Sequence, residues 1–506
     1  MQRFSCATLV VGLLILPCSA VAVPSRNHPV TVDSVTATRE VLAHAEQLVR
    51  DRDAKAATAT YARAFASAGF ARLREQERYQ ALAVAAAAAG DAGEYATSLD
   101  WSTRACVLPE AVDNTALWNV RLEAAYRLEN YPDGASSLAT IARHWPDALQ
   151  GIKVSAINNI ALKLKRDPAH AKEELELLES LFDAGWTING NQPGWRWLRL
   201  AGLWLERGKP QRAAVVAARI EQPSAIVAMR VDKRYDVLRR DDATMFDVER
   251  SKARYIARLE DYARTHPDRL EHSVDLQYAL LEAAQPKLAL RIADDIIAAA
   301  GSGNTKYTDF DDYYPWILDN RAAALWRLGR QDEAIDQVRH AARRPENGGL
   351  NVSQALNLGN YYAMHGETDK ALDAISDVGV LSAYGRMQQE RISAICAIQR
   401  HDDKELDVHL DYMRQHKIDA LGTYEEVLLD ANRIDAAAAL LIERLHAADE
   451  RSDALLSMQR YVGYPEPPFM QTRRERWRSV IARPDVQSAL AGVGRIEQAP
   501  LDEPGS

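Results

Sequence analysis

The chain has 506 residues, of which 47% are hydrophobic and 26% are charged, and its formal net charge is −9. These values are typical of an ordered globular protein and exclude the collagen-like, low-complexity and intrinsically disordered classes. A nucleic-acid-binding protein would show a basic domain or stripe, so the acidic balance predicts no nucleic-acid partner.

The first 22 residues have the features of a secretory signal peptide. Arg3 is followed by an apolar run from Phe4 to Leu16, and Ala20-Val21-Ala22 fits the small-x-small pattern that signal peptidase cleaves. The apolar run is shorter than the roughly 20 residues that a transmembrane helix needs. We therefore expect a mature periplasmic chain without a transmembrane segment. An outer-membrane lipoprotein attached through Cys18 is the less favoured alternative, because Pro17 stands where a small residue is expected.

A pattern of large, small and turn-forming residues recurs through most of the chain. Between Leu358 and Ala371, Gly359 provides a small residue and Tyr362 an aromatic one; Gly366 then ends the first helix, and Ala371 follows five positions later. Glycine suits the position after a helix because a positive φ costs it little. The same positions are filled elsewhere by Gly329 and Ala334, and by Trp197, Ala201, Trp204, Gly208 and Ala213.

This pattern resembles the tetratricopeptide repeat, whose unit is about 34 residues long. The small residue of the second helix recurs at spacings close to that period or to twice that period, at Ser98, Gly134, Ala213, Ala289, Ala334 and Ala371, with weaker matches at Leu406 and Ala437. Each of the two double spacings leaves room for one degenerate unit, around Ala171 and around Arg250. The resemblance implies an all-α fold, a right-handed α-α superhelix of about ten or more helix pairs. It also implies a concave face that binds a protein or peptide.

The pattern divides the chain into four segments. Residues 1–22 form the signal peptide, and residues 23–462 form the helical-repeat solenoid. The prolines in Gly463–Phe469 break the repeats, so we interpret residues 463–497 as a pair of capping helices. We expect residues 498–506 to form a disordered tail, and the basic run from Arg473 to Arg478 to lie on a solvated face of the cap.

The insert from Gly301 to Trp316 lengthens one repeat and combines aspartates with aromatic residues. Connecting loops often carry binding residues, so we expect a partner-binding site here. Pro315 predicts a helix start, with Trp316 packing inward. Calcium binding by the aspartates is a weaker alternative, because the glycine and glutamate of an EF-hand are missing. The exposed candidates are Tyr307, Asp309, Asp311, Asp312 and Tyr313.

The common catalytic motifs of metalloproteases, serine hydrolases and nucleotide-binding enzymes are not found in the sequence. We therefore expect a non-enzymatic protein without a cofactor or bound metal. One alternative is a solenoid of an exopolysaccharide export system, in which aromatic residues near Trp195 and Tyr313 stack on sugars. Another is an enzyme, since soluble lytic transglycosylases also join a signal peptide to a helical superhelix and use a Glu-Ser motif. Here Glu179-Ser180 lies in an ordinary amphipathic helix.

Overall fold

The computed structural model describes residues 34–302, 307–342 and 351–503. They form α-helices and short 3-10 turns, and the β-structure among them consists of isolated bridges. The expected signal peptide, its cleavage site and Cys18 lie outside the described residues. The chain divides into two compact units, residues 1–111 and 112–506. No helix in the described ranges is long and apolar enough to cross a membrane.

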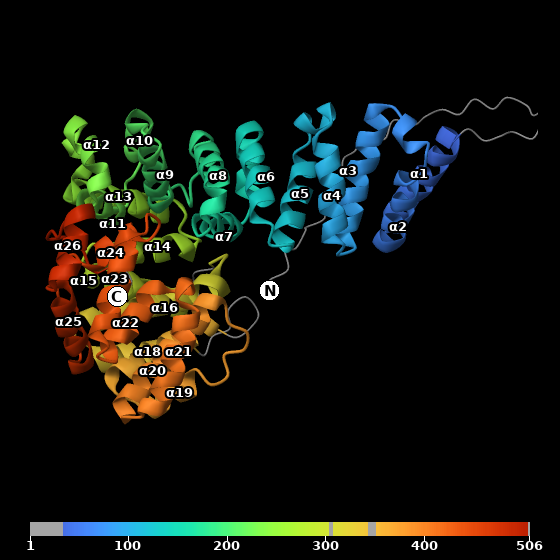
Figure 1. Cartoon of the computed structure of the whole chain (residues 1–506). Coiled ribbons are helices and arrows are strands. Elements are labelled where there is room, and N and C mark those ends of the chain that lie inside the picture. The colour runs from blue at the N-terminus through green and yellow to red at the C-terminus, as the bar shows by residue number, and fades with distance from the viewer. Residues whose placement is uncertain (1–33, 303–306, 343–350, 504–506) are drawn as a thin grey trace, which may run out of the picture. The chain divides into compact units, whose positions relative to one another are not determined.

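Antiparallel helix pairs build both units (Figure 1). The first unit holds α1 (Ser34–Arg50), α2 (Ala54–Phe65), α3 (Glu75–Asp91) and α4 (Tyr95–Cys106). The second unit begins with α5 (Thr115–Arg127), α6 (Tyr131–His144), α7 (Val154–Lys165), α8 (Ala171–Asp183), α9 (Gly194–Glu206), α10 (Pro210–Ala217), α11 (Pro223–Val231), α12 (Asp236–Asp241) and α13 (Val248–Thr265).

The rest of the second unit is more regular, and its helices alternate between two layers. Its helices are α14 (Leu270–Glu282), α15 (Pro286–Gly301), α16 (Phe310–Arg327), α17 (Gln331–Ala342), α18 (Val352–His365), α19 (Thr368–Ala374), α20 (Ala383–Arg400), α21 (Asp403–Gln415), α22 (Leu421–Asp430), α23 (Ile434–His446), α24 (Arg451–Ser457), α25 (Pro468–Ile481) and α26 (Pro484–Val493).

The all-α, tetratricopeptide-like solenoid expected from the sequence is confirmed by its turn geometry. The expected turn glycines have positive φ: Gly93, Gly208, Gly329 and Gly366. In four further turns a non-glycine residue takes the same conformation: Glu129, Ala284, His401 and Asn432. In each of these turns the next backbone N–H donates back into the last turn of the preceding helix, as Glu367 does to Tyr362 at 2.9 Å. This is the Schellman pattern of helix ends.

The small residues of the second helices are buried where these helices cross the first ones. Each follows its turn residue by five positions, and all are buried: Ser98, Gly134, Ala213, Ala289, Ala334, Ala371, Leu406 and Ala437. Gly359 shows why size matters at such a crossing. A Cβ added there would lie 2.5 Å from Ile375 Cγ2 and 3.2 Å from the Ala371 carbonyl oxygen. A larger side chain would therefore push the two helices apart.

The inner layer of the second unit is made by α14, α16, α18, α20 and α22. These helices contact one another, whereas α15, α17, α19 and α21 pack behind them as the outer layer. The chain then curves back on itself, so that α24 packs against α11 (Figure 1). The Arg166 guanidinium donates to the Asp419 carbonyl oxygen at 3.4 Å, and the Arg234 guanidinium donates to the Ala448 carbonyl oxygen at 3.2 Å. These two hydrogen bonds join early helices of the unit to late ones.

The tail expected to be disordered is instead ordered and buried as far as residue 503. Leu501 is fully buried, and its carbonyl oxygen accepts the Val462 N–H at 3.0 Å. Asp502 is 3% exposed and pairs with Arg327 of α16, while its N–H donates to the Glu282 carbonyl oxygen of α14. The expectation was wrong because the polar residues of this tail have partners far away in the sequence.

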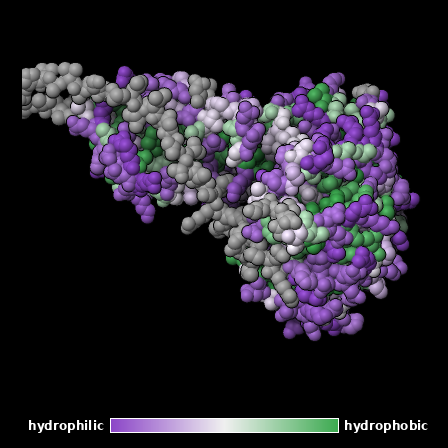
Figure 2. All heavy atoms as spheres, turned by 180° about the vertical axis from the view of Figure 1, so that it is seen from behind, coloured by the Kyte–Doolittle hydropathy of each residue, from purple (hydrophilic) through white to green (hydrophobic). Residues whose placement is uncertain are grey.

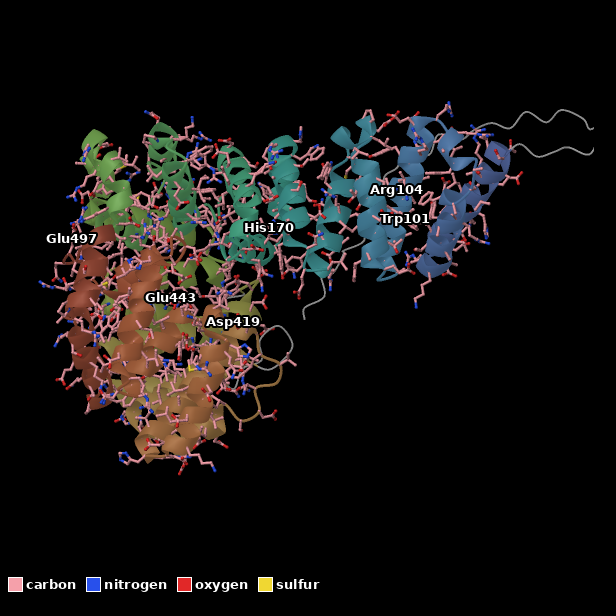
Figure 3. The ribbon with its side chains drawn as sticks, viewed as in Figure 1. Trp101, Arg104, His170, Asp419, Glu443 and Glu497 are labelled. Carbon is pink, nitrogen blue, oxygen red and sulfur yellow. The ribbon has the colours of Figure 1, made fainter. Side chains whose placement is uncertain are left out.

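The helix pair expected at residues 463–497 is present as α25 and α26, but α25 lies along several repeats. It contacts α18, α22 and α23, so it does more than cover the last hairpin. Its basic run is only partly solvated: Arg478 is exposed, whereas Arg473 and Arg476 are half-buried. Arg473 forms two hydrogen bonds with Asp430, at 2.7 and 2.5 Å, and Arg476 donates to the carbonyl oxygens of Leu429 and Asp430. Glu497, labelled in Figure 3, pairs with Arg230 at 2.5 Å and fastens the segment after α26.

Candidate partner-binding face

The expected site around residue 309 is partly a structural joint between two helices. Asp309 is 8% exposed, and its carboxylate accepts the backbone N–H groups of Leu270 and Glu271 at 2.8 and 3.0 Å. Arg269 Nε lies 3.4 Å from the same carboxylate. Asp309 therefore caps the start of α14, and the expectation that it is exposed was wrong. Because its carboxylate oxygens already accept these hydrogen bonds, they are poorly placed to bind calcium, which argues against the calcium alternative.

The two tyrosines of that site also pack against the protein. Tyr313 is half-buried and donates to Glu271 Oε1 at 2.7 Å, while Tyr307 is half-buried and stacks on Phe310. The helix begins at Phe310, so Pro315 lies inside it and not at its start as expected. The remaining candidates, Asp311 and Asp312, are exposed in the first turn of α16.

The tryptophan-rich segment, a candidate for sugar stacking, is mainly core. Trp197 is fully buried, packs edge-on to Phe182 at 5.2 Å and donates to Gln192. Trp204 is half-buried, and its indole N–H donates to Glu179 Oε2 at 2.8 Å. Sugar stacking needs an exposed aromatic face, whereas these two rings pack against the protein.

Glu179, the acidic residue of the Glu-Ser pair, forms hydrogen bonds that hold neighbouring helices together. Besides the Trp204 indole, it accepts a hydrogen bond from Arg212 Nε at 2.7 Å. Ser180 Oγ donates to the Glu176 carbonyl oxygen and accepts from Arg143. A general acid needs a carboxyl group that can reach a substrate, whereas this one joins α8 to α9 and α10.

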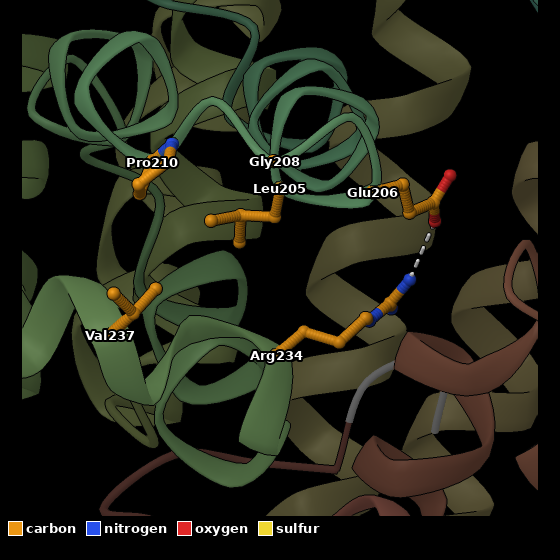
Figure 4. A pocket seen from close by; sticks show the side chains of 6 residues that line it. All are labelled: Leu205, Glu206, Gly208, Pro210, Arg234 and Val237. Carbon is orange, nitrogen blue, oxygen red and sulfur yellow. Dashed lines mark hydrogen bonds and ion pairs between the residues drawn. The ribbon is translucent and has the colours of Figure 1, made fainter.

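The pocket drawn in Figure 4 is shallow, and its two charged residues pair with each other. Its volume is about 350 Å³, and Leu205, Glu206, Gly208, Pro210, Arg234 and Val237 line it. Arg234 lies 3.2 Å from Glu206 and donates to the buried Asp232 at 2.6 and 2.9 Å. Nothing in this pocket offers an unpaired charge to a ligand.

The inner face of α14 and α16 carries a stripe of acidic and aromatic residues. Asp275 and Tyr278 lie about one turn apart on α14, while Asp312 and Asp319 lie two turns apart on α16, so each pair shares one side of its helix. Tyr361 of α18 extends the stripe. We call these five residues the inner acidic face.

The two half-buried carboxylates of this face are held by amides and not by cations. Asn189 donates to Asp275 at 3.1 Å, and Asn357 donates to both oxygens of Asp319 at 3.1 and 3.0 Å. Burial raises the pKa of Asp275 to about 6 and that of Asp319 to about 6, although the amide hydrogen bonds oppose this shift. Among the ion pairs of the described residues, none joins either carboxylate to an arginine or lysine.

Tyr278 lies on α14, about one turn from Asp275. Its side chain is 45% exposed, yet burial raises the pKa of its hydroxyl, and the charges of Asp319 and Asp275 raise it further. The same two causes, burial and the charge of Asp319, raise the pKa of Tyr361.

The chain's own C-terminal segment covers only the far ends of these inner helices. Asp502 contacts Glu282 and Arg327, the last residues of α14 and α16. Phe469 and Met470 of α25 pack against the core around α18. Asp275 and Asp312 lie in the first halves of their helices and Asp319 lies at the middle of α16, whereas Tyr278 is one turn from Glu282 at the end of α14.

Sequence reasoning identified Asp312 but missed Asp275, Tyr278, Asp319 and Tyr361. The signal that could have found them is the polar content of the first helices: aspartates or asparagines recur at Asp275, Asp319 and Asn357, on the side that faces away from the second helices. Their meeting on one face depends on how the hairpins stack.

Comparison with known proteins adds little to this picture. No family model and no curated protein matches the chain. Among solved structures, a Cut9–Hcn1 hetero-tetramer of APC/C is 11% identical, with 90% of this chain and 96% of that chain covered and a TM-score of 0.30. Yeast Tom70 is 11% identical over 91% of this chain and 88% of its own, with a TM-score of 0.25. A Naa15/Naa10 structure is 10% identical over 90% and 77%, with a TM-score of 0.22.

Proposed function

We propose that this protein is a non-enzymatic scaffold that binds another protein in the periplasm through the inner acidic face. The observation that carries the proposal is Tyr278, a large aromatic side chain left 45% exposed on α14, a helix of the inner layer of a helical solenoid. Exposed aromatic residues are typical anchors of protein interfaces.

The location is part of the same proposal and depends on the first 22 residues. Arg3, the apolar run and Ala20-Val21-Ala22 support export, with the mature chain beginning at Val23. Amino-terminal sequencing of the protein from a periplasmic fraction should read from Val23. An intact amino terminus on exported protein, or lipid on Cys18, would contradict it.

Site-specific photocrosslinking in cells tests the binding function. A photoreactive amino acid in place of Tyr278 should give one or a few discrete crosslinked species on irradiation. The matched control is Leu288 of α15, which is 38% exposed on the outer layer of the same hairpin. No crosslinked species from position 278, or the same species from both positions, would contradict binding at the inner face.

A further inference from the structure

We propose that the tight turn between α8 and α9 is a pH-sensitive clip, which holds α13 and α14 at neutral pH and is released when the buried imidazole of His272 takes up a proton. We call residues 188–191 the clip turn. This inference concerns a conformational device and does not depend on the proposed binding function.

The clip turn is a two-residue hairpin. Ile188 and Asn191 exchange backbone hydrogen bonds at 2.9 and 2.8 Å, and the two residues between them have positive φ, 50° at Asn189 and 74° at Gly190. A hairpin this short is marginally stable by itself, so its order depends on what it packs against.

The tip of the clip turn contacts both α13 and α14. The Asn189 amide donates to Asp275 Oδ2 of α14 at 3.1 Å. The backbone of Gly190 lies against the ring of Tyr262 on α13, so closely that a Cβ at Gly190 would lie 2.7 Å from Tyr262 Cε2. The clip turn and Tyr262 therefore hold each other in place.

Tyr262 is one of three rings that pack together. Its ring centre lies 4.5 Å from that of His266 and 4.5 Å from that of His272, and the two imidazoles are 5.0 Å apart. His272, on the first turn of α14, is 6% exposed. Its buried Nδ1 has no hydrogen-bond partner among the residues that the structure describes.

The unpartnered Nδ1 favours the neutral form of His272. In a neutral imidazole one nitrogen carries no hydrogen, and we assign Nδ1 as that nitrogen. Protonation would bury an N–H group and a positive charge without an acceptor, which costs more. Burial accordingly lowers the pKa of His272. To take up a proton the ring must reach water, which requires Tyr262 and the clip turn to move.

The charged groups around His272 come from three helices and do not cancel this cost. Glu271 of α14 and Asp309 beside α16 favour the protonated ring, whereas Arg269 and a protonated His266, which follows α13, oppose it. Both carboxylates already accept hydrogen bonds from other groups. Burial outweighs these charges, so the clipped state keeps His272 neutral.

Asp275 titrates in the opposite sense. Burial raises its pKa to about 6, so its proton uptake stabilises the clipped state as pH falls. The pKa of His272 is lowered, so its contribution is present above the ordinary histidine value of about 6.5 and is lost as pH falls below it. D275N removes the opposing titration and keeps an oxygen that accepts from Asn189.

Hydrogen exchange followed by mass spectrometry on D275N tests the proposal. After correction for the pH dependence of the chemical exchange rate, opening of residues 186–193 and 262–275 should be about fivefold or more greater at pH 5.0 than at pH 7.5. The upper limit for one histidine with an ordinary pKa in the open state is about thirtyfold over this range.

The double variant H272Q/D275N should lose this pH dependence, because glutamine does not titrate. The matched control is H340Q/D275N, since His340 is exposed on α17 and keeps its contact with water in both states. Hydrophilic residues cover most of the face that Figure 2 shows, and ionisable groups in such places respond little to opening. The control should therefore keep the rise of D275N.

Three results would overturn the proposal. D275N could show no greater opening at pH 5.0, or the rise could persist in H272Q/D275N. A rise of equal size throughout α16–α22 would mean acid unfolding of the whole unit and not release of a clip. Circular dichroism melting shows whether the variants are folded. If H272Q/D275N is not, the size and location of the rise in D275N decide the question.

Discussion

At the scale of single residues, several polar side chains of this protein join one helix to another. Asp309 caps α14, Glu179 holds Trp204 and Arg212, and Arg473 binds Asp430. Asp275 and Asp319 differ from these because their partners are amides. A residue whose charge is costly to the fold and is not paired within it is a good candidate for function.

The variant D319N should be more stable than the unchanged protein at neutral pH. Burial raises the pKa of Asp319 to about 6, above the ordinary value of an aspartate, so the native state is penalised when the group is ionised. The native state takes up the proton near pH 6 and the unfolded state near pH 4, so the penalty shrinks as pH falls between these values. Allowing for solvent screening, we expect D319N to gain about 1 kcal/mol at pH 7.5 and nothing near pH 4.

Urea denaturation at several pH values measures this difference, with the exposed D295N as the control. A D319N variant that is less stable at pH 7.5 would contradict the expectation. So would a difference that stays constant from pH 7.5 to pH 4, because it could not come from titration of this carboxyl group.

At the scale of elements, the C-terminal segment is what closes the second unit. Residues 495–503, after α26, fasten to α11, α14 and α16 through Arg230, Glu282 and Arg327. Their sequence looks like an ordinary tail, but Leu501 is fully buried among helices that come much earlier in the chain. Such a segment stabilises elements that are distant in the sequence.

The variant L501D should release this segment. A carboxylate in a fully buried apolar place loses its hydration without gaining a partner, at a cost of several kcal/mol. We expect faster amide hydrogen exchange at the ends of α14 and α16, which the segment covers, and little change in α5 and α6. The control is Q498D, which adds the same charge at an exposed position of the segment. Equal exchange in both variants would show that Leu501 does not fasten the segment.

At the scale of the molecule, the chain behaves as two compact units that meet at residues 111 and 112. The first unit has its own core, which includes Tyr61, Phe70 and Trp101. Phe65 packs edge-on to Trp101 at 5.0 Å, which ties α2 to α4. Units with separate cores unfold separately unless a large apolar interface joins them.

The variant G69V should therefore loosen the first unit alone. A Cβ at Gly69 would collide with the backbone carbonyl of Ser34, which cannot move away without displacing α1. Hydrogen exchange followed by mass spectrometry should show faster exchange in α1–α4 and no change in α5–α26. The control is G90A, because a Cβ there meets only the Ser98 side chain at 3.5 Å. Faster exchange throughout the second unit would show that the two units unfold together.

The repeat architecture could be predicted from the order of the residues because it depends on local rules. Gly329 and Gly366 follow their helices at the positions where a left-handed residue is needed, and Ala334 and Ala371 stand five residues later at the helix crossings. These offsets survive in any stack of such hairpins. The glycine pattern nevertheless misses some of the repeats. The same turn is adopted by four residues that are not glycine: Glu129, Ala284, His401 and Asn432.

The position of the inner acidic face and the closure by the tail were decided only by the tertiary structure. Asp275 and Asp319 lie on successive first helices of the repeats, and only the stacking of α14 on α16 brings these two helices into one layer. Leu501 and Arg327 meet their partners because the second unit curves back on itself. Local spacing specifies each hairpin, whereas the small rotation between hairpins adds up over many repeats, and that sum determines which distant residues meet.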